Sequence, residues 1–203
     1  MSEQEIKKIL KEKLSEKRYI HTIAVAETAE RLASKLIKSR EMAVRSDRES
    51  FLERVRLAAL LHDYAKELGL NELMNHVTLA QKEWGIDTDE LLIPQILHAP
   101  VSAYLAKTEL GVKDLEILEA VRYHAIGNNG MGIIAELIFV ADFVEPNRDF
   151  SAAEKVRKEI KIKGLESGII MICDLTIKYN IDNRRMLHPN TVLLRNAYLR
   201  RQA

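Results

Sequence analysis

The stretch RLAALLHDYAK, residues 56–66, joins an apolar helical run to a His-Asp pair. Its leucines and alanines favour a helix that is buried over most of its surface. An isolated ionised carboxylate in such surroundings costs several kcal/mol, so Asp63 requires a partner. A metal ion bound by His62 and Asp63 would be such a partner. The pair alone is weak evidence, because a neutral histidine with one hydrogen bond also fits a protein core.

Further residues of the metal-binding kind lie in apolar surroundings along the chain: His21, His98, His124 and Asp142. Imidazole nitrogens and carboxylate oxygens are ligands for Zn, Fe and Mn, and a cluster of thiolates is missing. Neighbouring helical residues point about 100° apart, so His62 and Asp63 could bind one ion only near a helix end. With His21 and Asp142 contributed by other helices, the sequence predicts a metal site in the core of a helical bundle.

Apolar residues return at intervals of three and four along nearly the whole chain, and alternating patterns of period two are missing. This pattern predicts an all-α protein that forms a single domain over residues 1–203 and contains eight to ten helices. One of them ends at the His62-Asp63 pair. The others are expected at about residues 3–15, 19–37, 71–84, 94–110, 114–125, 132–144, 151–163, 166–180 and 191–201.

Local signals agree with these helix ends. Ser151 followed by Glu154 predicts a capping box at the start of one helix. The polar segment 39–53 is expected to be a solvated loop or a helix extension without a function of its own. Glycines that could adopt a positive φ stand at four expected helix ends, namely Gly85, Gly111, Gly127 and Gly164.

The composition limits the partners of the chain. Of its 203 residues, 47% are hydrophobic, and the 30% that are charged nearly cancel at a net charge of +1. This balance gives no overall electrostatic attraction to nucleic acid or to an anionic membrane. The N-terminus lacks a signal-peptide pattern, and no apolar run approaches the roughly 18 residues that span a bilayer. We expect a cytoplasmic protein whose single cysteine, Cys173, lies in the core. The sequence does not decide whether the protein forms a homodimer.

Six short blocks define the chain more narrowly. They are RYIHT with VA (18–22 and 25–26), AALLHDYAK (58–66), HAPVSAYL (98–105), AVRYH (120–124), ADFVEPNR (141–148), and HP with RN (188–189 and 195–196). The order of these blocks resembles the order of the motifs in the HD superfamily of metal-dependent phosphohydrolases, whose fold is all-helical. From about residue 18 to 199 the chain resembles the YqeK-type symmetrical bis(5′-nucleosyl)-tetraphosphatases.

The resemblance implies a two-metal centre and a reaction. His21, His62, Asp63 and Asp142 would hold one divalent ion, and His98 and His124 a second ion that shares Asp63 as a bridge. Iron is the usual metal of the family, with Mn, Co or Zn as alternatives. The substrate would be a dinucleoside polyphosphate, diadenosine tetraphosphate, cut symmetrically to two ADP. On the sequence alone, His98 and His124 are equally compatible with helix-capping or core histidines.

Cationic residues near the pair are candidates for binding phosphate. Lys66 lies one helical turn after His62, where the family also has a lysine, although a solvated lysine is the alternative. Arg148 offers a guanidinium fork for phosphate oxygens, unless it is a plain surface arginine. His188 is either a loop histidine or a phosphate or base contact. We expect Asp63, Lys66 and Arg148 to be catalytic, and Lys66, Arg148 and His188 to bind substrate.

Two other functions stay open. An HD-type nucleotidase or phosphodiesterase acting on a monophosphate, a guanosine alarmone or a cyclic dinucleotide would use the same metal core. A non-catalytic nucleotide-sensing module would keep the fold without the reaction. The segment 125–131, AIGNNGM, lacks the small hydroxyl residues and the Arg-Pro that are usual in the family. The sequence therefore does not establish whether this loop contacts the substrate. All six metal-type positions are present, which favours an enzyme.

Overall fold

The computed structural model describes residues 2–39 and 45–202, and every regular element in these ranges is helical. This confirms the predicted all-α fold. The described elements are α1 (Glu3–Lys13), α2 (Glu16–Ser39), α3 (Arg45–Leu61), α4 (Leu70–Trp84), α5 (Thr88–Leu91), the 3-10 helix η1 (Pro94–Ile96), α6 (His98–Thr108), α7 (Leu115–Tyr123), α8 (Ile133–Val144), α9 (Ser151–Lys163), α10 (Leu165–Asp182) and α11 (Pro189–Gln202).

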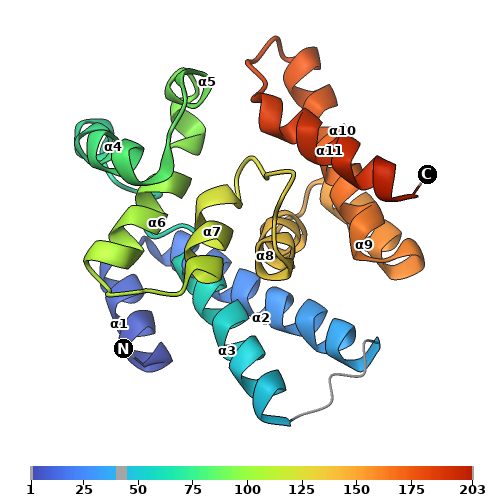
Figure 1. Cartoon of the computed structure of the whole chain (residues 1–203), viewed down its shortest axis with the longest axis horizontal. Coiled ribbons are helices and arrows are strands. Elements are labelled where there is room, and N and C mark those ends of the chain that lie inside the picture. Colours follow the sequence, from blue (N-terminus) through green and yellow to red (C-terminus); the bar gives the residue numbers. More distant parts are fainter. Residues whose placement is uncertain (1, 40–44, 203) are drawn as a thin grey trace.

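The helices surround a central element, α8. Figure 1 shows α2 and α3 below it, α4 to α7 on one side and α9 to α11 on the other. Helix α8 packs against α2, α3, α7, α9 and α10. Its sequence IIAELIFVADFV is apolar on nearly all sides, and such a helix is stable only when neighbours cover its whole surface. Asp142, near the end of α8, is thereby held in the core of the bundle.

The helix boundaries differ from the predicted ones in two places. The structure has one short additional helix, α5, so the described part contains eleven α-helices rather than eight to ten. The helix expected at 94–110 is divided into η1 and α6. Pro100 explains this division, because a proline without an N–H group fits only the first turn of an α-helix. Helix α6 therefore begins at His98.

The segment 39–53 is a helix extension from residue 45 onward, since α3 begins at Arg45. Residues 40–44 of that segment lie outside the described residues. Within the described ranges, none of the helices combines the length and the apolar character needed to cross a membrane.

The predicted capping box at Ser151 is wrong. The N-cap residue of α9 is Phe150, so Ser151 is already the first helical residue and no side chain caps this end. Glu154 instead forms ion pairs with Arg157 and Lys158 one turn further along the helix. The glycine predictions are confirmed, because positive φ angles occur at all four positions: Gly85, Gly111, Gly127 and Gly164.

Gly127 provides a stability test. It has a φ of 73°, and a Cβ atom added there would overlap with Cδ2 of Leu194 on α11. We expect Gly127→Ala to lower the free energy of unfolding by about 2–4 kcal/mol, from backbone strain and overpacking together. Gly85→Ala is the matched control, because Gly85 has a φ of 62° with open space around its Cα, and should lose about 1–2 kcal/mol. Equal losses in urea denaturation would contradict the packing role of Gly127.

Candidate metal centre

The structure brings the six predicted metal-type residues together at the centre of the bundle. His21 lies in α2 and Asp142 in α8, whereas His62 and Asp63 directly follow α3. His98 is the first residue of α6, and His124 directly follows α7. Because α3 packs against α2, α6, α7 and α8, these positions converge on one place. The ligand atoms form three overlapping groups in which all members lie within 4.8 Å of one another.

Asp63 lies between two pairs of histidines. Its Oδ2 is 3.6 Å from Nε2 of His21 and 3.3 Å from Nε2 of His62. Its Oδ1 is 3.2 Å from Nε2 of His98 and 3.7 Å from Nε2 of His124. Each oxygen of this buried carboxylate thus faces a different pair, an arrangement suited to a carboxylate that bridges two cations.

Asp142 lies nearest to the first of these pairs, although a ligand oxygen of Asp142 also lies within 4.8 Å of ligand nitrogens of His62 and His124. Its Oδ1 lies 3.0 Å from Nε2 of His21 and 3.9 Å from Nε2 of His62. The centre is therefore divided into a carboxylate-rich half, with His21, His62 and Asp142, and a histidine half, with His98 and His124. Asp63 belongs to both halves.

Three of the histidines are oriented by the ends of helices. Each directs its Nδ1 atom at the carbonyl oxygen three residues earlier: His62 to Ala59 at 2.6 Å, His98 to Gln95 at 2.9 Å, and His124 to Val121 at 2.7 Å. The last carbonyls of a helix have no partner within the helix, and here an imidazole N–H donates to them. Nδ1 therefore carries the proton, and Nε2 presents a lone pair to the centre.

His21 is oriented by a carboxylate instead. Its Nδ1 lies 3.1 Å from Oε1 of Glu145, which is buried at the end of α8. The second oxygen of Glu145 accepts a hydrogen bond from the backbone N–H of Asn147 at 2.7 Å. A histidine held by a carboxylate in this way is a stronger base at its other nitrogen.

The donor set fits a divalent metal ion. With the proton on Nδ1, the Nε2 atoms of His98 and His124 are both acceptors, yet they face each other at 3.1 Å. Two such lone pairs repel unless a cation lies between them. The Nε2 atoms of His21 and His62 are buried and form no hydrogen bond with any described residue. Nitrogen and oxygen donors without thiolate are typical of Fe, Mn and Zn sites.

The electrostatics of the centre also favour a cation. Burial raises the pKa of Asp63 and of Asp142, but the neighbouring histidines, and Arg148 beside Asp142, outweigh burial and hold both pKa values well below the usual range. Burial lowers the pKa of His98 to about 4, so this imidazole is neutral at pH 7. For His62 burial lowers the pKa, but the two carboxylates outweigh burial and raise it, so a metal ion bound there would have to displace the proton that these carboxylates favour. Ionised carboxylates and a neutral imidazole are the forms that bind metals.

Three basic side chains reach the centre. Nη1 of Arg18 lies 2.7 Å from Oδ2 of Asp63, and Nη2 of Arg148 lies 2.7 Å from Oδ1 of Asp142. Nζ of Lys66 is 3.1 Å and 3.2 Å from the two ring nitrogens of His98. Lys66 and Arg148 thus lie beside the cluster, and their expected roles in catalysis and substrate binding stay predictions.

Arg18 and Glu145 were not among the predicted site residues. Each had a signal in the sequence, because each lies three residues from a predicted ligand: Arg18 before His21, and Glu145 after Asp142. Residues three apart share a helix face, so both could have been placed beside the centre.

His188 lies outside the cluster. Its Nε2 is 3.2 Å from both carboxylate oxygens of Asp87, and its Nδ1 accepts a hydrogen bond from the backbone N–H of Asn190. The side chain is buried, so its expected role as a direct substrate contact stays a prediction.

A cavity of about 420 Å³ borders the carboxylate-rich half at His21. Its walls include Arg18, His21, Glu145, Asn147 and Arg148. The side chains of Arg18, Asp142 and Arg148 are 26%, 24% and 33% exposed, whereas those of His98 and His124 are 6% and 1% exposed. An anionic molecule would therefore reach the centre from the arginine side.

Fold and site together define a helical bundle with a candidate metal centre, and sequence comparison identifies its family. The HD domain model matches residues 18–177, so the chain belongs to the HD domain family. It is 36% identical to the symmetrical bis(5′-nucleosyl)-tetraphosphatase of Halalkalibacterium halodurans, over 96% of this chain and 95% of that protein. It is 34% identical to the enzyme of the same name from Bacillus subtilis, over 97% of each chain. These findings confirm the resemblance seen in the sequence.

A solved structure has the same fold. The crystal structure of a predicted HD superfamily hydrolase involved in NAD metabolism, from Clostridium acetobutylicum, matches with a TM-score of 0.85 and 31% sequence identity. The match covers 99% of this chain and 98% of that one. The helices beyond residue 177, where the HD domain model ends, are therefore part of the shared architecture.

Glu145 provides a test of the centre that leaves every predicted ligand in place. Glu145→Ala removes the acceptor that orients His21, and we expect metal affinity to fall by about 10–100-fold. Glu154→Ala, an exposed carboxylate on α9, is the control and should leave the affinity unchanged. Titration with Mn²⁺ against a competing chelator measures both. An equal affinity in the two variants would refute the orienting role of Glu145.

Proposed function

We propose that this protein is a metal-dependent phosphoanhydride hydrolase that cleaves diadenosine tetraphosphate symmetrically into two ADP. The observation that carries the proposal is the position of Asp63, whose two oxygens face separate pairs of histidines. A two-metal centre of this kind is suited to phosphoryl chemistry. The relatives named symmetrical bis(5′-nucleosyl)-tetraphosphatase cover nearly the full chain and support the choice of substrate.

The six clustered residues would hold two divalent ions. The first ion would be bound by His21, His62, Asp63 and Asp142, and the second by Asp63, His98 and His124. We propose iron as the metal, and Mn, Co or Zn fit the same donors. When bound, such ions lower the pKa of water toward neutrality and neutralise charge on the reacting phosphates.

The basic residues of the chain would bind and orient the polyphosphate. Arg148 and Arg18 each hold a carboxylate of the centre and face the cavity that borders it, where their N–H groups can donate to phosphate oxygens. Lys66 is directed at the histidine half. Burial lowers its pKa, although the nearby Asp63 and Asp142 oppose this effect. Asp63 would also orient the attacking water as a hydrogen-bond acceptor.

The proposal also covers the domain organisation, the compartment and the partners of the protein. We propose that residues 1–203 form one HD-type domain that acts in the cytoplasm on a small molecule, without nucleic acid or membrane partners. Helix α10 packs on α8 and joins α9 and α11 to the same core, which supports a single domain. The buried free thiol of Cys173 is compatible with a reducing compartment. A homodimer is compatible with the fold.

The position of the cut distinguishes this function from the alternatives. Attack on either central phosphorus of a tetraphosphate bridge leaves a nucleoside diphosphate on each side. We expect hydrolysis of diadenosine tetraphosphate in oxygen-18 water to release ADP alone, with one label per bond cut. Chromatography with mass analysis measures the products. AMP plus ATP would indicate an asymmetrical enzyme, and no turnover with Fe, Mn or Co while a monophosphate is consumed would indicate a nucleotidase.

Metal stoichiometry tests the division of the centre into two halves. We expect His98→Ala or His124→Ala to lower the metal content from about two ions to about one ion per chain, because each removes a donor of the second ion alone. His76→Ala, on α4 and outside the cluster, is the control. An unchanged metal content in both ligand variants would mean a mononuclear centre in which these histidines have another role.

A further inference from the structure

Helix α9 carries none of the six predicted ligands, but one of its side chains holds the backbone next to the metal centre. Arg157 extends from α9 to the segment that follows α8. Its Nε donates to the carbonyl of Val144 at 2.9 Å, and its Nη2 donates to the carbonyls of Glu145 at 2.6 Å and of Arg148 at 2.7 Å. We call residues 144–148 the α8–α9 turn. A single guanidinium thus holds three carbonyls of this turn.

These carbonyls lie where α8 ends, and the last carbonyls of a helix have no partner within the helix. Arg148 donates through its Nε to the carbonyl of Asp142 at 3.0 Å, and its backbone N–H donates to the carbonyl of Glu145 at 3.0 Å. The carbonyl of Val144, the last residue of α8, receives its hydrogen bond from Arg157. A positive charge at the C-terminus of a helix is also stabilised by the helix dipole. Arg157 therefore completes the hydrogen bonding at this end of α8.

The α8–α9 turn carries two side chains that contact the carboxylate-rich half of the centre. Oε1 of Glu145 lies 3.1 Å from Nδ1 of His21, and Nη2 of Arg148 lies 2.7 Å from Oδ1 of Asp142. Arg157 holds the backbone carbonyl of both Glu145 and Arg148. Because a side chain moves with its own backbone, a shift of the turn would move both contacts together. The hydrogen bonds of Arg157 fix the positions from which these contacts are made.

An arginine is suited to this role. Its guanidinium is planar and presents several N–H donors in fixed directions, so one side chain can hold carbonyls that belong to different residues. A second contact joins the same two helices, because the ring of Phe150 lies edge-on to that of Phe143 with 5.4 Å between the ring centres. The chain that leads from α8 to α9 is thus held by Arg157 on its backbone and by an aromatic pair at its far end.

We infer that Arg157 is a positioning residue of the metal centre, which acts through the α8–α9 turn on Glu145 and thereby on His21. It acts at a distance, because its hydrogen bonds go to backbone carbonyls and not to a predicted ligand. The inference rests on the proposed function, because the orientation of His21 matters for metal binding only if this imidazole holds an ion. Helix α9 then contributes to the centre without supplying a ligand to it.

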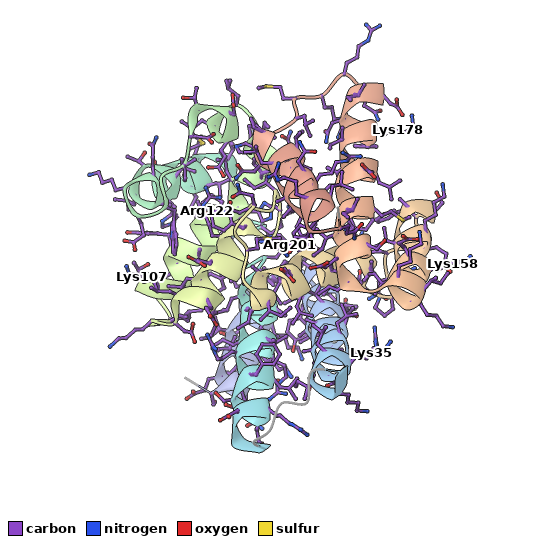
Figure 2. The ribbon with its side chains drawn as sticks, turned by 45° about the vertical axis from the view of Figure 1, so that its right-hand side comes forward. Lys35, Lys107, Arg122, Lys158, Lys178 and Arg201 are labelled. Atoms are coloured by element: carbon purple, nitrogen blue, oxygen red, sulfur yellow. The ribbon has the colours of Figure 1, made fainter. Side chains whose placement is uncertain are left out.

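The test measures metal affinity rather than turnover. Arg157→Gln removes the guanidinium, and we expect the affinity for Mn²⁺, titrated against a competing chelator, to fall about three- to tenfold. The loss of a positive charge near the centre would by itself strengthen the binding of a cation, so a weaker affinity reports the geometry and not the charge. Lys158→Gln is the matched control. It makes the same change of charge at the next residue, on the outer face of α9 (Figure 2), and should change the affinity by less than about twofold.

A double-variant cycle shows whether Arg157 acts through Glu145. In protein that carries Glu145→Ala the contact with His21 is already lost, so adding Arg157→Gln should change the Mn²⁺ affinity by less than about twofold. A residue that only stabilises the fold would change the affinity by the same factor in both backgrounds. Urea denaturation in the presence of EDTA establishes that each variant is folded. If Arg157→Gln does not fold, Pro146→Gly loosens the same turn at an exposed position and should give the same dependence on Glu145.

The outcomes separate this inference from the proposed function. An unchanged Mn²⁺ affinity in folded Arg157→Gln, an equal loss in the two backgrounds, or an equal loss in Lys158→Gln would overturn the inference. Failure of the proposed function appears elsewhere, as the absence of ADP release from diadenosine tetraphosphate by the unaltered protein.

Discussion

The fold depends on one buried carboxylate, that of Asp63. An ionised carboxylate in a protein core is costly unless hydrogen bonds and opposite charges compensate it. Here the compensation comes from four histidines and from Arg18, which are contributed by α2, by the residues directly after α3 and α7, and by the start of α6. The segments that carry them therefore converge on a single point, where the apolar helix α8 packs against α2, α3 and α7, and α6 packs against α3 and α7.

Helix ends solve a geometric problem that helix interiors cannot. Side chains inside a helix point outward at fixed intervals, and several of them cannot face one small centre. At its end, a helix offers carbonyls without partners, and His62, His98 and His124 each use one of them to fix the ring. A single hydrogen bond then both provides a partner for a backbone carbonyl and orients the histidine ring. The break before α6 that Pro100 imposes is part of this arrangement, because it makes His98 a terminal residue.

The all-α class and the meeting of His21, His62, Asp63 and Asp142 could be predicted, because apolar periodicity and ligand-type side chains are local signals. The resemblance to the HD superfamily was needed to add His98 and His124 to the centre. The supporting contacts could not be predicted in the same way. Arg18 and Glu145 each lie three residues from a predicted ligand, but their contacts with Asp63 and His21 form only when α2, α3 and α8 are placed together. His188 pairs with Asp87, which is 101 residues away in the sequence, and such a pairing depends on the tertiary structure. Ser151 failed as a cap because the helix begins one residue earlier than its hydroxyl would require.

The two halves of the centre differ in a way that bears on a symmetrical substrate. The carboxylate-rich half lies beside a cavity lined by two arginines, whereas the side chains of His98 and His124 are almost fully buried. The ends of a dinucleoside polyphosphate would thus meet unlike surroundings even though they are chemically identical. A symmetrical cut does not require a symmetrical site. It requires only that the middle of the tetraphosphate lies at Asp63.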